Sequence, residues 1–386
     1  MESIRILERL VACATVSRDS NLELIEYVRE FLSARGIEAR LYRDATAPKS
    51  NLYARIGPPV EGGMLLSGHT DVVPVDGQRW SCDPFRLTER SGRLFARGAA
   101  DMKGFLACAL RAAERAATRT LRSPLHLAFS YDEEVGCLGV RSLIDDMASW
   151  TQRPAFCIVG EPTLLRTAVG HKGKTALRAR CHGRAAHSAA PDRGVNAIYM
   201  ACELIGAVRR RQLDIAHSAV RDPAYQVPHT TLHVGLMRGG TALNIVPADC
   251  ELELEIRNVP PDDPAAIVAG IRSDARAIVR ALPRHAEIDA IDARIELEPL
   301  HDYPALETPA DSQVVELAAA LTGNRETIKV DFGSEAGLYS SRLAIPTVVC
   351  GPGSIDQAHK PDEFVALDQL ARCDAMMDAL LDVLTS

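Results

Sequence analysis

Residues 125–136 read LHLAFSYDEEVG, an apolar run that ends in three adjacent acidic residues, Asp132, Glu133 and Glu134. A short apolar run of this kind predicts a buried strand of a layered sheet. Neighbouring carboxylates repel one another, and burying them without cations is costly. The end of this strand is therefore where we expect the fold and a charged functional site to meet.

Length and composition indicate a globular protein with more than one domain. The chain has 386 residues, which exceeds the usual limit for a single hydrophobic core, so two domains are expected. Its formal charge of −7 and its dispersed basic residues argue against nucleic acid or an anionic membrane as partner. No apolar stretch approaches the roughly 20 residues of a membrane helix. Glu8 and Arg9 interrupt the first apolar residues, and the ten cysteines have no paired spacing, so we expect a cytoplasmic protein with reduced thiols.

The outer parts of the chain alternate helical and strand patterns. Amphipathic helices are predicted over 2–13, 21–36 and 102–119, and strands over 51–57, 62–69, 125–132 and 155–161. After about residue 297 the pattern returns, with helices over 312–323 and 366–384 and a strand over 346–351. This alternation is typical of an α/β domain with a largely buried sheet.

A segment of different character lies between these parts. Residues 175–183, 230–237 and 249–259 alternate apolar and polar side chains, which predicts strands with one wet face. With helices near 195–213 and 263–282 and a final strand over 286–299, the order is β-α-β-β-α-β, a ferredoxin-like α+β unit. We therefore expect a discontinuous domain of residues 1–174 and 297–386, interrupted by an inserted domain of residues 175–296.

Candidate metal ligands fall where the apolar strands end or on nearby loops: His69 and Asp71, Asp101, Glu133 and Glu134, Glu161, and His359. This edge of an open α/β sheet is where ligands bind. Taken singly, each residue has a structural explanation, since Asp101 could begin a helix and His69 could be an interior histidine. Together, several carboxylates at one sheet edge favour a divalent cation, and mixed imidazole and carboxylate ligands suit Zn, Co or Mn.

Five segments, SGHTDVVP, ARGAADMKG, SYDEEVG, VGEPT and AHKPDEF, resemble in order and spacing the motifs of the di-zinc aminoacylase, deacetylase and carboxypeptidase G family of metallopeptidases. The resemblance covers essentially the whole chain. It implies a mixed-sheet catalytic domain of the di-zinc peptidase type with an inserted ferredoxin-like dimerisation domain. It also implies two divalent metal ions, held by five ligands: His69 and Glu161 at one ion, Glu134 and His359 at the other, and Asp101 bridging both.

The same resemblance implies roles for the remaining acids at this edge. Glu133 would be the general base that acts on water, and Asp71 would orient His69 through its ring N–H. Neighbouring side chains of an extended segment point in opposite directions, so Glu133 and Glu134 are expected to have different surroundings. Asp132 has no assigned role.

The inserted domain carries three further candidates. The segment GRAAHSAAPDRGVNAI resembles the family segment whose histidine, here His187, reaches into the active site of the partner subunit and stabilises an oxyanion, which implies a homodimer. Asn244 and Arg257 match positions that bind the substrate carboxylate. The alternation around Arg257 by itself favours an exposed strand residue, whereas the resemblance favours the binding role.

The stretches VGHKGK, DFGSEAGLYS and CGPGSIDQAHKPDEF are most similar to the acetylornithine deacetylase branch of that family. The likeness implies that the chain removes the acetyl group from N2-acetyl-L-ornithine, and we expect Glu335 to supply negative charge for the ammonium group of this substrate. One alternative is another small acyl amino acid, such as N-acetylcitrulline or succinyl-diaminopimelate. An alternative of another class is a metal-binding scaffold without catalysis.

Overall fold

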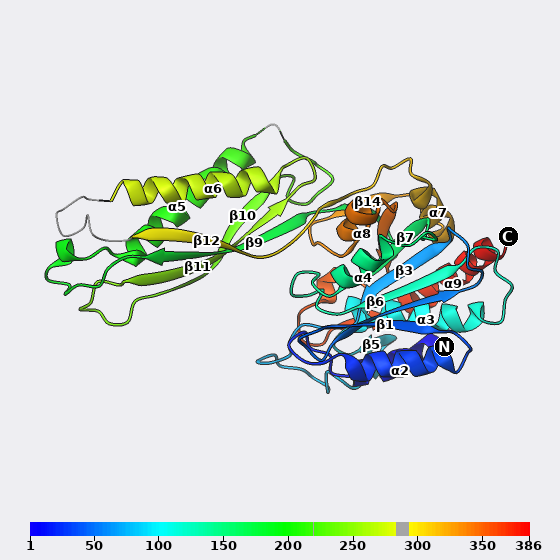
Figure 1. Cartoon of the computed structure of the whole chain (residues 1–386). Helices are drawn as coiled ribbons and strands as arrows, with labels where there is room; N and C mark the ends of the chain where they lie inside the picture. The colour runs from blue at the N-terminus through cyan, green and yellow to red at the C-terminus, as the bar shows by residue number, and fades with distance from the viewer. Residues whose placement is uncertain (219, 283–292) are drawn as a thin grey trace. The chain divides into compact units, whose positions relative to one another are not determined.

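A mixed sheet forms the centre of the larger of two units, both drawn in Figure 1. The structure is a computed structural model, and it describes residues 1–218, 220–282 and 293–386. The larger unit comprises Met1–His171 and Leu306–Ser386, and the smaller unit comprises Lys172–Ala305. The chain therefore divides after residues 171 and 305, where we had expected divisions after 174 and 296.

The sheet of the larger unit has its strands in the order β1 (Ala39–Arg43), β2 (Ser50–Ile56), β6 (Leu125–Ser130), β3 (Met64–His69), β7 (Phe156–Pro162), β15 (Thr347–Gly351), β8 (Thr167–His171) and β13 (Leu306–Glu307), with β14 (Thr327–Val330) beside β8. At its centre β3 is parallel to β6 and β7, and β15 is parallel to β7. These strands are almost entirely buried, as their continuous apolar runs predict. Because they are parallel, their carboxyl ends meet at one edge of the sheet.

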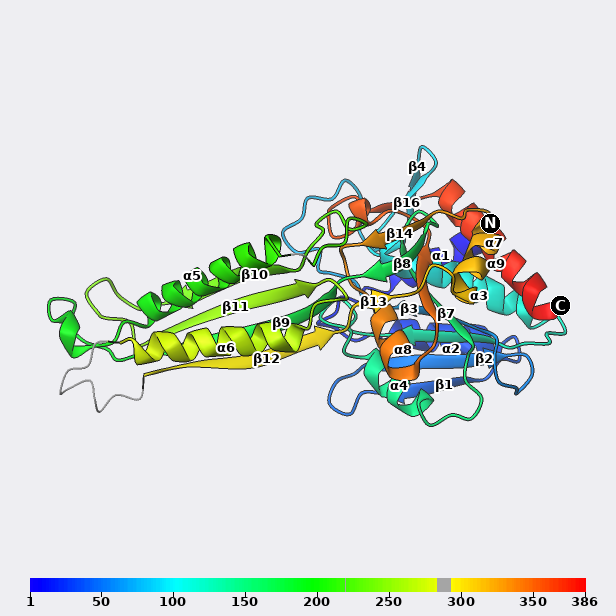
Figure 2. The same ribbon diagram turned by 90° about the horizontal axis from the view of Figure 1, so that it is seen from above.

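Helices cover both faces of this sheet. The main core is built by α1 (Glu2–Ala12), α2 (Leu22–Ser33), α3 (Gly104–Ala116), α7 (Gln313–Thr322) and α9 (Leu367–Thr385). Leu52, Ala54 and Ile56 of β2 face this core, whereas the alternate residue Asn51 donates a hydrogen bond to Ser142 of α4 (Val140–Met147), at 3.1 Å. Since strand side chains alternate between faces, α4 and its neighbour α8 (Ala336–Leu343) lie on the opposite face, as Figure 2 shows.

Two small elements complete the larger unit. The strands β4 (Thr88–Arg90), β5 (Arg93–Phe95) and β16 (Phe364–Ala366) form a separate small sheet. The short helical segment η1 (Ala99–Lys103) leads directly into α3, and the turn η3 (Ile355–Gln357) follows β15. None of the described helices combines the length and apolar character needed to cross a membrane.

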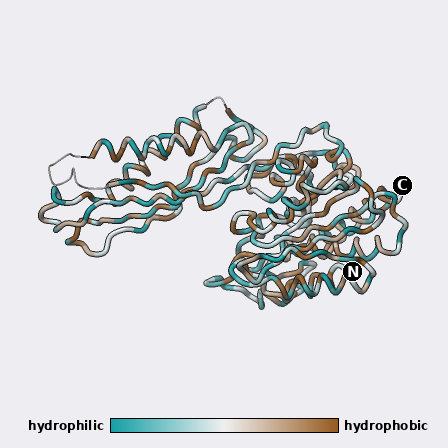
Figure 3. The backbone as a smooth tube through the Cα atoms, in the orientation of Figure 1, coloured by the Kyte–Doolittle hydropathy of each residue, from teal (hydrophilic) through white to brown (hydrophobic). Residues whose placement is uncertain are grey.

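The smaller unit has the predicted order β-α-β-β-α-β: β9 (Gly173–His182), α5 (Ala197–Ala216), β10 (Thr231–Gly239), β11 (Asp249–Asn258), α6 (Pro264–Arg280) and β12 (Arg294–Tyr303). The short turn η2 (Pro191–Arg193) precedes α5. The sheet order is β10-β11-β9-β12, and both helices lie on one face of it (Figure 2). Hydrophobic and hydrophilic residues alternate along its strands (Figure 3), and the buried apolar side chains of β11 are Cys250, Leu252, Leu254 and Ile256. The alternation therefore indicated the covered face correctly.

The last strand of the smaller unit continues beyond the one we expected. That strand was expected to end at residue 299, whereas the pairing of β12 with β9 passes a bulge after Pro299 and continues to Tyr303. The first half of the expected strand, residues 286–292, lies outside the described residues.

One buried histidine gives the larger unit a pH-sensitive contact. His126 of β6 lies between Tyr53, whose hydroxyl is 2.6 Å from Nδ1, and the Gly62 carbonyl, which is 3.0 Å from Nε2. A neutral ring that donates from Nε2 and accepts at Nδ1 satisfies both partners. Burial lowers the pKa of His126 to about 4, and the nearby Arg55 adds to the shift while the Gly62 contact opposes it.

We expect this histidine to destabilise the metal-free protein in acid. Between about pH 6.5 and 4 the unfolded chain binds a proton on His126 that the folded chain does not bind, so stability falls as the pH falls through this window. The His126→Gln variant has no such group, so the wild type should lose about 2 kcal/mol more unfolding free energy than the variant between pH 7.5 and 5. Urea unfolding in the presence of a chelator measures both slopes, and parallel slopes would contradict the assignment.

Candidate metal centre

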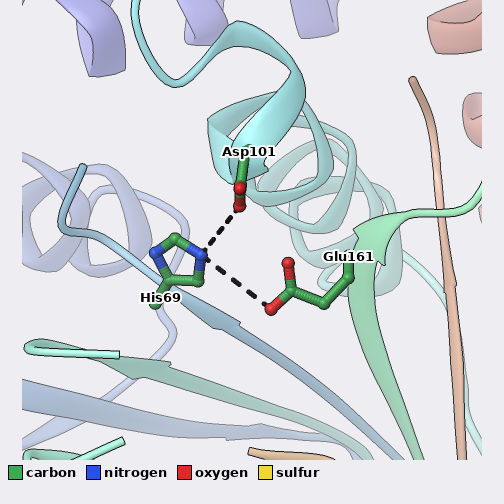
Figure 4. Close-up of side chains that lie close together, drawn as sticks. All are labelled: His69, Asp101 and Glu161. Carbon is green, nitrogen blue, oxygen red and sulfur yellow. Dashed lines mark hydrogen bonds and ion pairs between the residues drawn. The ribbon is translucent and has the colours of Figure 1, made fainter. Parts of the chain in front are cut away.

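The first ligand cluster lies where two central strands end. His69 is the last residue of β3, Glu161 lies near the end of β7, and Asp101 lies in η1. Figure 4 shows the three side chains pointing toward one another. His69 Nε2 lies 3.1 Å from Asp101 Oδ1 and 3.9 Å from Glu161 Oε1. The fold therefore brings these three predicted ligands into one buried cluster.

A second cluster uses the other oxygen of the same aspartate. His359 Nε2 lies 3.4 Å from Asp101 Oδ2 and 3.1 Å from Glu134 Oε2. The side chain of Glu134 is 7% exposed and that of His359 is 52% exposed. Ligand atoms of Asp101, Glu134 and His359 all lie within 4.8 Å of one another, as do those of the first cluster. Asp101 is thus shared by two groups of potential ligands.

The electrostatics of these clusters favour cations. Glu161 Oε1 is buried and has no hydrogen-bond partner among the described residues, although it faces the ring of His69. Burial raises the pKa of Glu161 well above its usual range, and the carboxylate of Asp101 adds to the shift. Buried acids without partners are costly, and a divalent ion supplies the missing charge and ligand interaction. The residues present therefore fit a site for two divalent metal ions.

Glu133 lies beside these clusters but belongs to neither. Its carboxylate accepts a hydrogen bond from the thiol of Cys137, at 3.4 Å, and burial raises the pKa of Glu133 to about 8 although His69 opposes the shift. We expected an extended segment here, but the amides of Gly136 and Cys137 both bond to the Glu133 carbonyl, which makes a turn. The carboxylates of Glu133 and Glu134 therefore contact different residues because the chain turns here. The alternation of side chains along a strand, which we had expected to separate them, is not the cause.

Asp71 contacts the ring of His69 mainly through its backbone. The ring nitrogen Nδ1 of His69 donates to the main-chain carbonyl of Asp71 at 2.8 Å, whereas the carboxylate is 3.6 Å away. The carboxylate instead accepts hydrogen bonds from the amides of Glu133 (3.1 Å) and Glu134 (3.3 Å) and from the Ser17 hydroxyl (2.7 Å). Asp71 therefore orients the ring through its backbone and holds the Glu133–Glu134 turn through its side chain.

Asp132, which the sequence left without a role, pairs with Lys49. The two groups are 2.6 Å apart, and the same ammonium group donates to the Ser17 carbonyl. Asp132 has a φ of +56°, a conformation that aspartate adopts more readily than most residues. The pair tethers the beginning of the acidic turn to the loop before β2.

Glu335 is placed differently from our expectation. Its carboxylate is 1% exposed and accepts hydrogen bonds from the hydroxyls of Ser67 and Ser130, which lie on β3 and β6. Burial raises the pKa of Glu335 to about 7, against the opposing Ser130 contact. Direct contact with the ammonium group of a substrate needs an accessible carboxylate, and the packing of α8 on the sheet covers this one.

The three remaining candidates lie in the smaller unit. His187 is exposed, and its Nδ1 accepts a hydrogen bond from the Ala189 amide at 3.0 Å, so its proton is on Nε2. The strand-like pairing of His187 with Ile245 brings Asn244 alongside it, since the Ser188 amide donates to the Asn244 carbonyl. Arg257 donates to the Tyr303 hydroxyl at 2.7 Å and to Glu255 at 3.2 Å. Its side chain is 28% exposed, so it lies between an exposed strand residue and a buried one.

Sequence reasoning missed several residues that support the clusters. Arg97 and Glu363 form a buried ion pair at 2.6 Å beside the backbone of Asp101, although both lie within motifs that we had singled out. The buried ammonium of Lys103 donates to the carbonyls of Leu10 and Cys13, which ties η1 to the end of α1. These contacts join segments far apart in the chain, so the motifs could mark the residues without revealing the partners.

Comparisons with known proteins establish the family of the chain. Residues 65–383 match the family described as peptidase family M20/M25/M40. The chain belongs to this family. An acetylornithine deacetylase of Myxococcus xanthus is 36% identical over 376 residues, which cover 96% of this chain and 94% of the relative. A second one, from Photorhabdus laumondii subsp. laumondii, is 34% identical and covers 98% and 96%.

Solved structures of the M20 family share the fold. A metallo-carboxypeptidase from Sulfolobus solfataricus matches with a TM-score of 0.79 at 18% identity, over 100% of this chain and 99% of that one. A peptidase from Bacillus subtilis described as dinuclear metal binding matches with a TM-score of 0.67 at 16% identity, over 100% and 98%. Membership of this peptidase family confirms the mixed α/β fold class and the prediction that the chain is a hydrolytic enzyme.

The buried charge of Glu161 leads to a prediction about stability without metal. Glu161→Gln removes a buried charge that has no hydrogen-bond partner at Oε1 among the described residues, so the metal-free variant should be more stable than metal-free wild type by about 1–2 kcal/mol. It should also gain less stability than wild type when Zn²⁺ is added, because a ligand is lost. Denaturant unfolding with chelator and with Zn²⁺ measures both effects. Glu326→Gln, which changes an exposed carboxylate paired with Arg166, is the control, and a less stable metal-free Glu161→Gln would contradict the prediction.

Proposed function

We propose that the protein removes the acetyl group from N2-acetyl-L-ornithine to give acetate and L-ornithine. The observation that carries the proposal is the pair of ligand clusters sharing Asp101, with the buried carboxylate of Glu133 beside them and outside both. Support for this substrate comes from five curated relatives, 33–36% identical over nearly their whole length, that carry the name acetylornithine deacetylase.

The proposed cofactors are two divalent metal ions, with Zn, Co or Mn best suited to imidazole and carboxylate ligands. Asp101 would be shared, with His69 and Glu161 completing one site and Glu134 and His359 the other. When bound, the ions would supply Lewis-acid polarisation of the amide carbonyl and make water more acidic. His69 is oriented to bind a metal ion through Nε2. Its Nδ1–H donates a hydrogen bond to the Asp71 carbonyl, which leaves Nε2 facing the cluster.

Glu133 is the proposed proton carrier. It would take a proton from the attacking water while the water oxygen bonds to the amide carbon. It would then pass that proton to the departing nitrogen as the carbon–nitrogen bond breaks, which leaves acetate and the free amine of ornithine. The Asp71 carboxylate would position Glu133 and Glu134 together, because it accepts hydrogen bonds from both amides.

His187 is proposed to stabilise the negative oxygen that forms during attack. The Ala189 amide keeps Nδ1 as an acceptor, so Nε2–H is available as a donor on an exposed ring. Following the resemblance, we propose that this donor serves the metal centre of a second copy of the chain. Asn244, beside it, and Arg257 are the proposed ligands of the substrate carboxylate.

A homodimer through the smaller unit agrees with the surface of that unit. β10 lies at an edge of its sheet, and its Leu236 and Met237 are 46% and 42% exposed. On α5, Tyr199 is 69% exposed. An exposed apolar edge strand is a liability in a monomer and a ready contact for a second copy. We also propose a cytoplasmic location, which suits ten free cysteines.

A substrate panel tests the proposed activity. The metal-loaded protein should hydrolyse N2-acetyl-L-ornithine with a kcat/KM at least about tenfold above its values for N-acetylcitrulline, succinyl-diaminopimelate and other acyl amino acids. Glu133→Gln keeps the shape of the side chain but cannot carry the proton, so turnover should fall about 10²–10⁴-fold while metal content stays at the wild-type level. A higher kcat/KM for another panel member would replace the substrate. The absence of hydrolysis for every member would favour a scaffold.

Mixing two inactive variants tests the contribution of His187 from a second copy. His187→Ala and Glu133→Gln should each be inactive alone. In a mixed dimer, one of the two centres combines an intact Glu133 with the partner's His187, so random exchange should restore about a quarter of wild-type activity. The measurement is activity after co-expression or subunit exchange, with equilibrium sedimentation for the mass. Full wild-type activity in a monomer, or no recovery in a proven mixed dimer, would refute the arrangement.

A further inference from the structure

We propose that Arg97, Glu363 and Gln78 form a clamp that fixes segment η1, which carries Asp101, relative to the loop of His359. The clamp thereby sets the metal affinity of the second site, which consists of Asp101, Glu134 and His359. The inference rests on the proposed metal centre. It assigns positioning roles to residues that are not ligands. We call these three residues the Arg97 clamp.

Glu363 holds the backbone on which the shared ligand stands. Its Oε1 accepts hydrogen bonds from the amides of Ala100 at 2.9 Å and Asp101 at 3.1 Å, and its Oε2 accepts one from Arg97 at 2.6 Å. The side chains of Arg97 and Glu363 are each 1% exposed. The carboxylate therefore links the guanidinium group directly to the main chain of Asp101.

Arg97 extends the same connection to the other loop. It donates to the Lys360 carbonyl at 3.4 Å and to the side-chain oxygen of Gln78 at 2.6 Å, and the Gln78 amide donates to the His359 carbonyl at 3.1 Å. His359 has a φ of +62°, which for a residue other than glycine persists only when surrounding contacts hold it. These contacts on the His359 and Lys360 carbonyls are suited to hold that conformation.

The burial of the Arg97–Glu363 ion pair also indicates that the pair positions the backbone around Asp101. A buried pair is often no more stabilising than apolar residues of similar volume, so its presence is better explained by the geometry it imposes. Breaking it leaves an unpaired buried charge next to the shared ligand.

The second site should depend on the clamp more than the first. His69 and Glu161 belong to buried central strands of the sheet, which hold them independently of the clamp. His359 stands on a loop with 52% of its side chain exposed, so loosening that loop should displace this ligand first. Residues that support metal ligands typically change metal affinity 10–100-fold.

Metal titration of the full chain tests the clamp without any acyl substrate. Calorimetry follows the titration of three metal-free proteins with Co²⁺: the wild type, Gln78→Met and Glu363→Gln. The number of metal ions bound to each protein is then measured after dialysis. Gln78→Met should weaken one binding step 10–100-fold and leave the other within about threefold. Glu363→Gln, which also loosens the backbone of the shared Asp101, should weaken the same step at least as strongly. The weakened step should be the one that His359→Ala abolishes. Asp374→Asn, which changes a buried carboxylate paired with Ser3 and Arg111, is the control and should leave both steps unchanged.

The outcomes separate the clamp from the proposed activity. If both steps are unchanged in Gln78→Met, or weakened equally in the variants and the control, the clamp is wrong. Gln78 is only half-buried, so this variant decides the question even if Glu363→Gln does not fold. A wild type that takes up fewer than two ions overturns the clamp together with the proposed metal centre. A clamp-dependent second step in a protein that hydrolyses no acyl amino acid supports the clamp and refutes the activity.

Discussion

The cost of gathering buried carboxylates at one sheet edge is the constraint on which the rest of this structure depends. Asp101, Glu133 and Glu161 are all buried within one small region, and an unsatisfied oxygen of Glu161 faces into it. Two neighbouring acids have fixed donors, since main-chain amides bond to Asp71 and the ammonium group of Lys49 pairs with Asp132. Divalent ions would neutralise the negative charge of the carboxylates that have no such donors.

The proposed metal ligands differ in how firmly the backbone holds them, and this difference follows from the topology of the sheet. Parallel strands β3 and β7 deliver His69 and Glu161 from buried backbone, where sheet pairing limits movement. Asp101, Glu134 and His359 come from segments outside strands, whose geometry depends on side-chain contacts. A loop ligand can adjust or be released at lower cost than a strand ligand, since fewer backbone hydrogen bonds must change. Two sites that share one aspartate can therefore differ in affinity although their ligand types are alike.

Whether a contact could be predicted from the sequence depends on how far apart its two residues lie along the chain. Apolar runs and their ends located β3, β6 and β7, and with them the positions of His69, Glu134 and Glu161, because strand burial is a local pattern. The partner of Asp132 could not be found this way, since Lys49 is distant in the chain and only sheet pairing brings them together. The burial of Glu335 was equally hidden, because it depends on how α8 packs over Ser67 and Ser130.

The turn at Glu133 explains how two adjacent identical residues can serve different ends. On a continuing strand their carboxylates would point to opposite faces of the sheet, and one would leave the site. A turn keeps both near the cluster, with Glu134 directed at His359 and Glu133 directed at Cys137. Asp71 stabilises that turn by accepting hydrogen bonds from both amides, so one carboxylate fixes the positions of two others. Because the turn is held through main-chain amides, the Glu133 side chain does not have to hold it and stays outside both ligand clusters, as the proposed proton transfer requires.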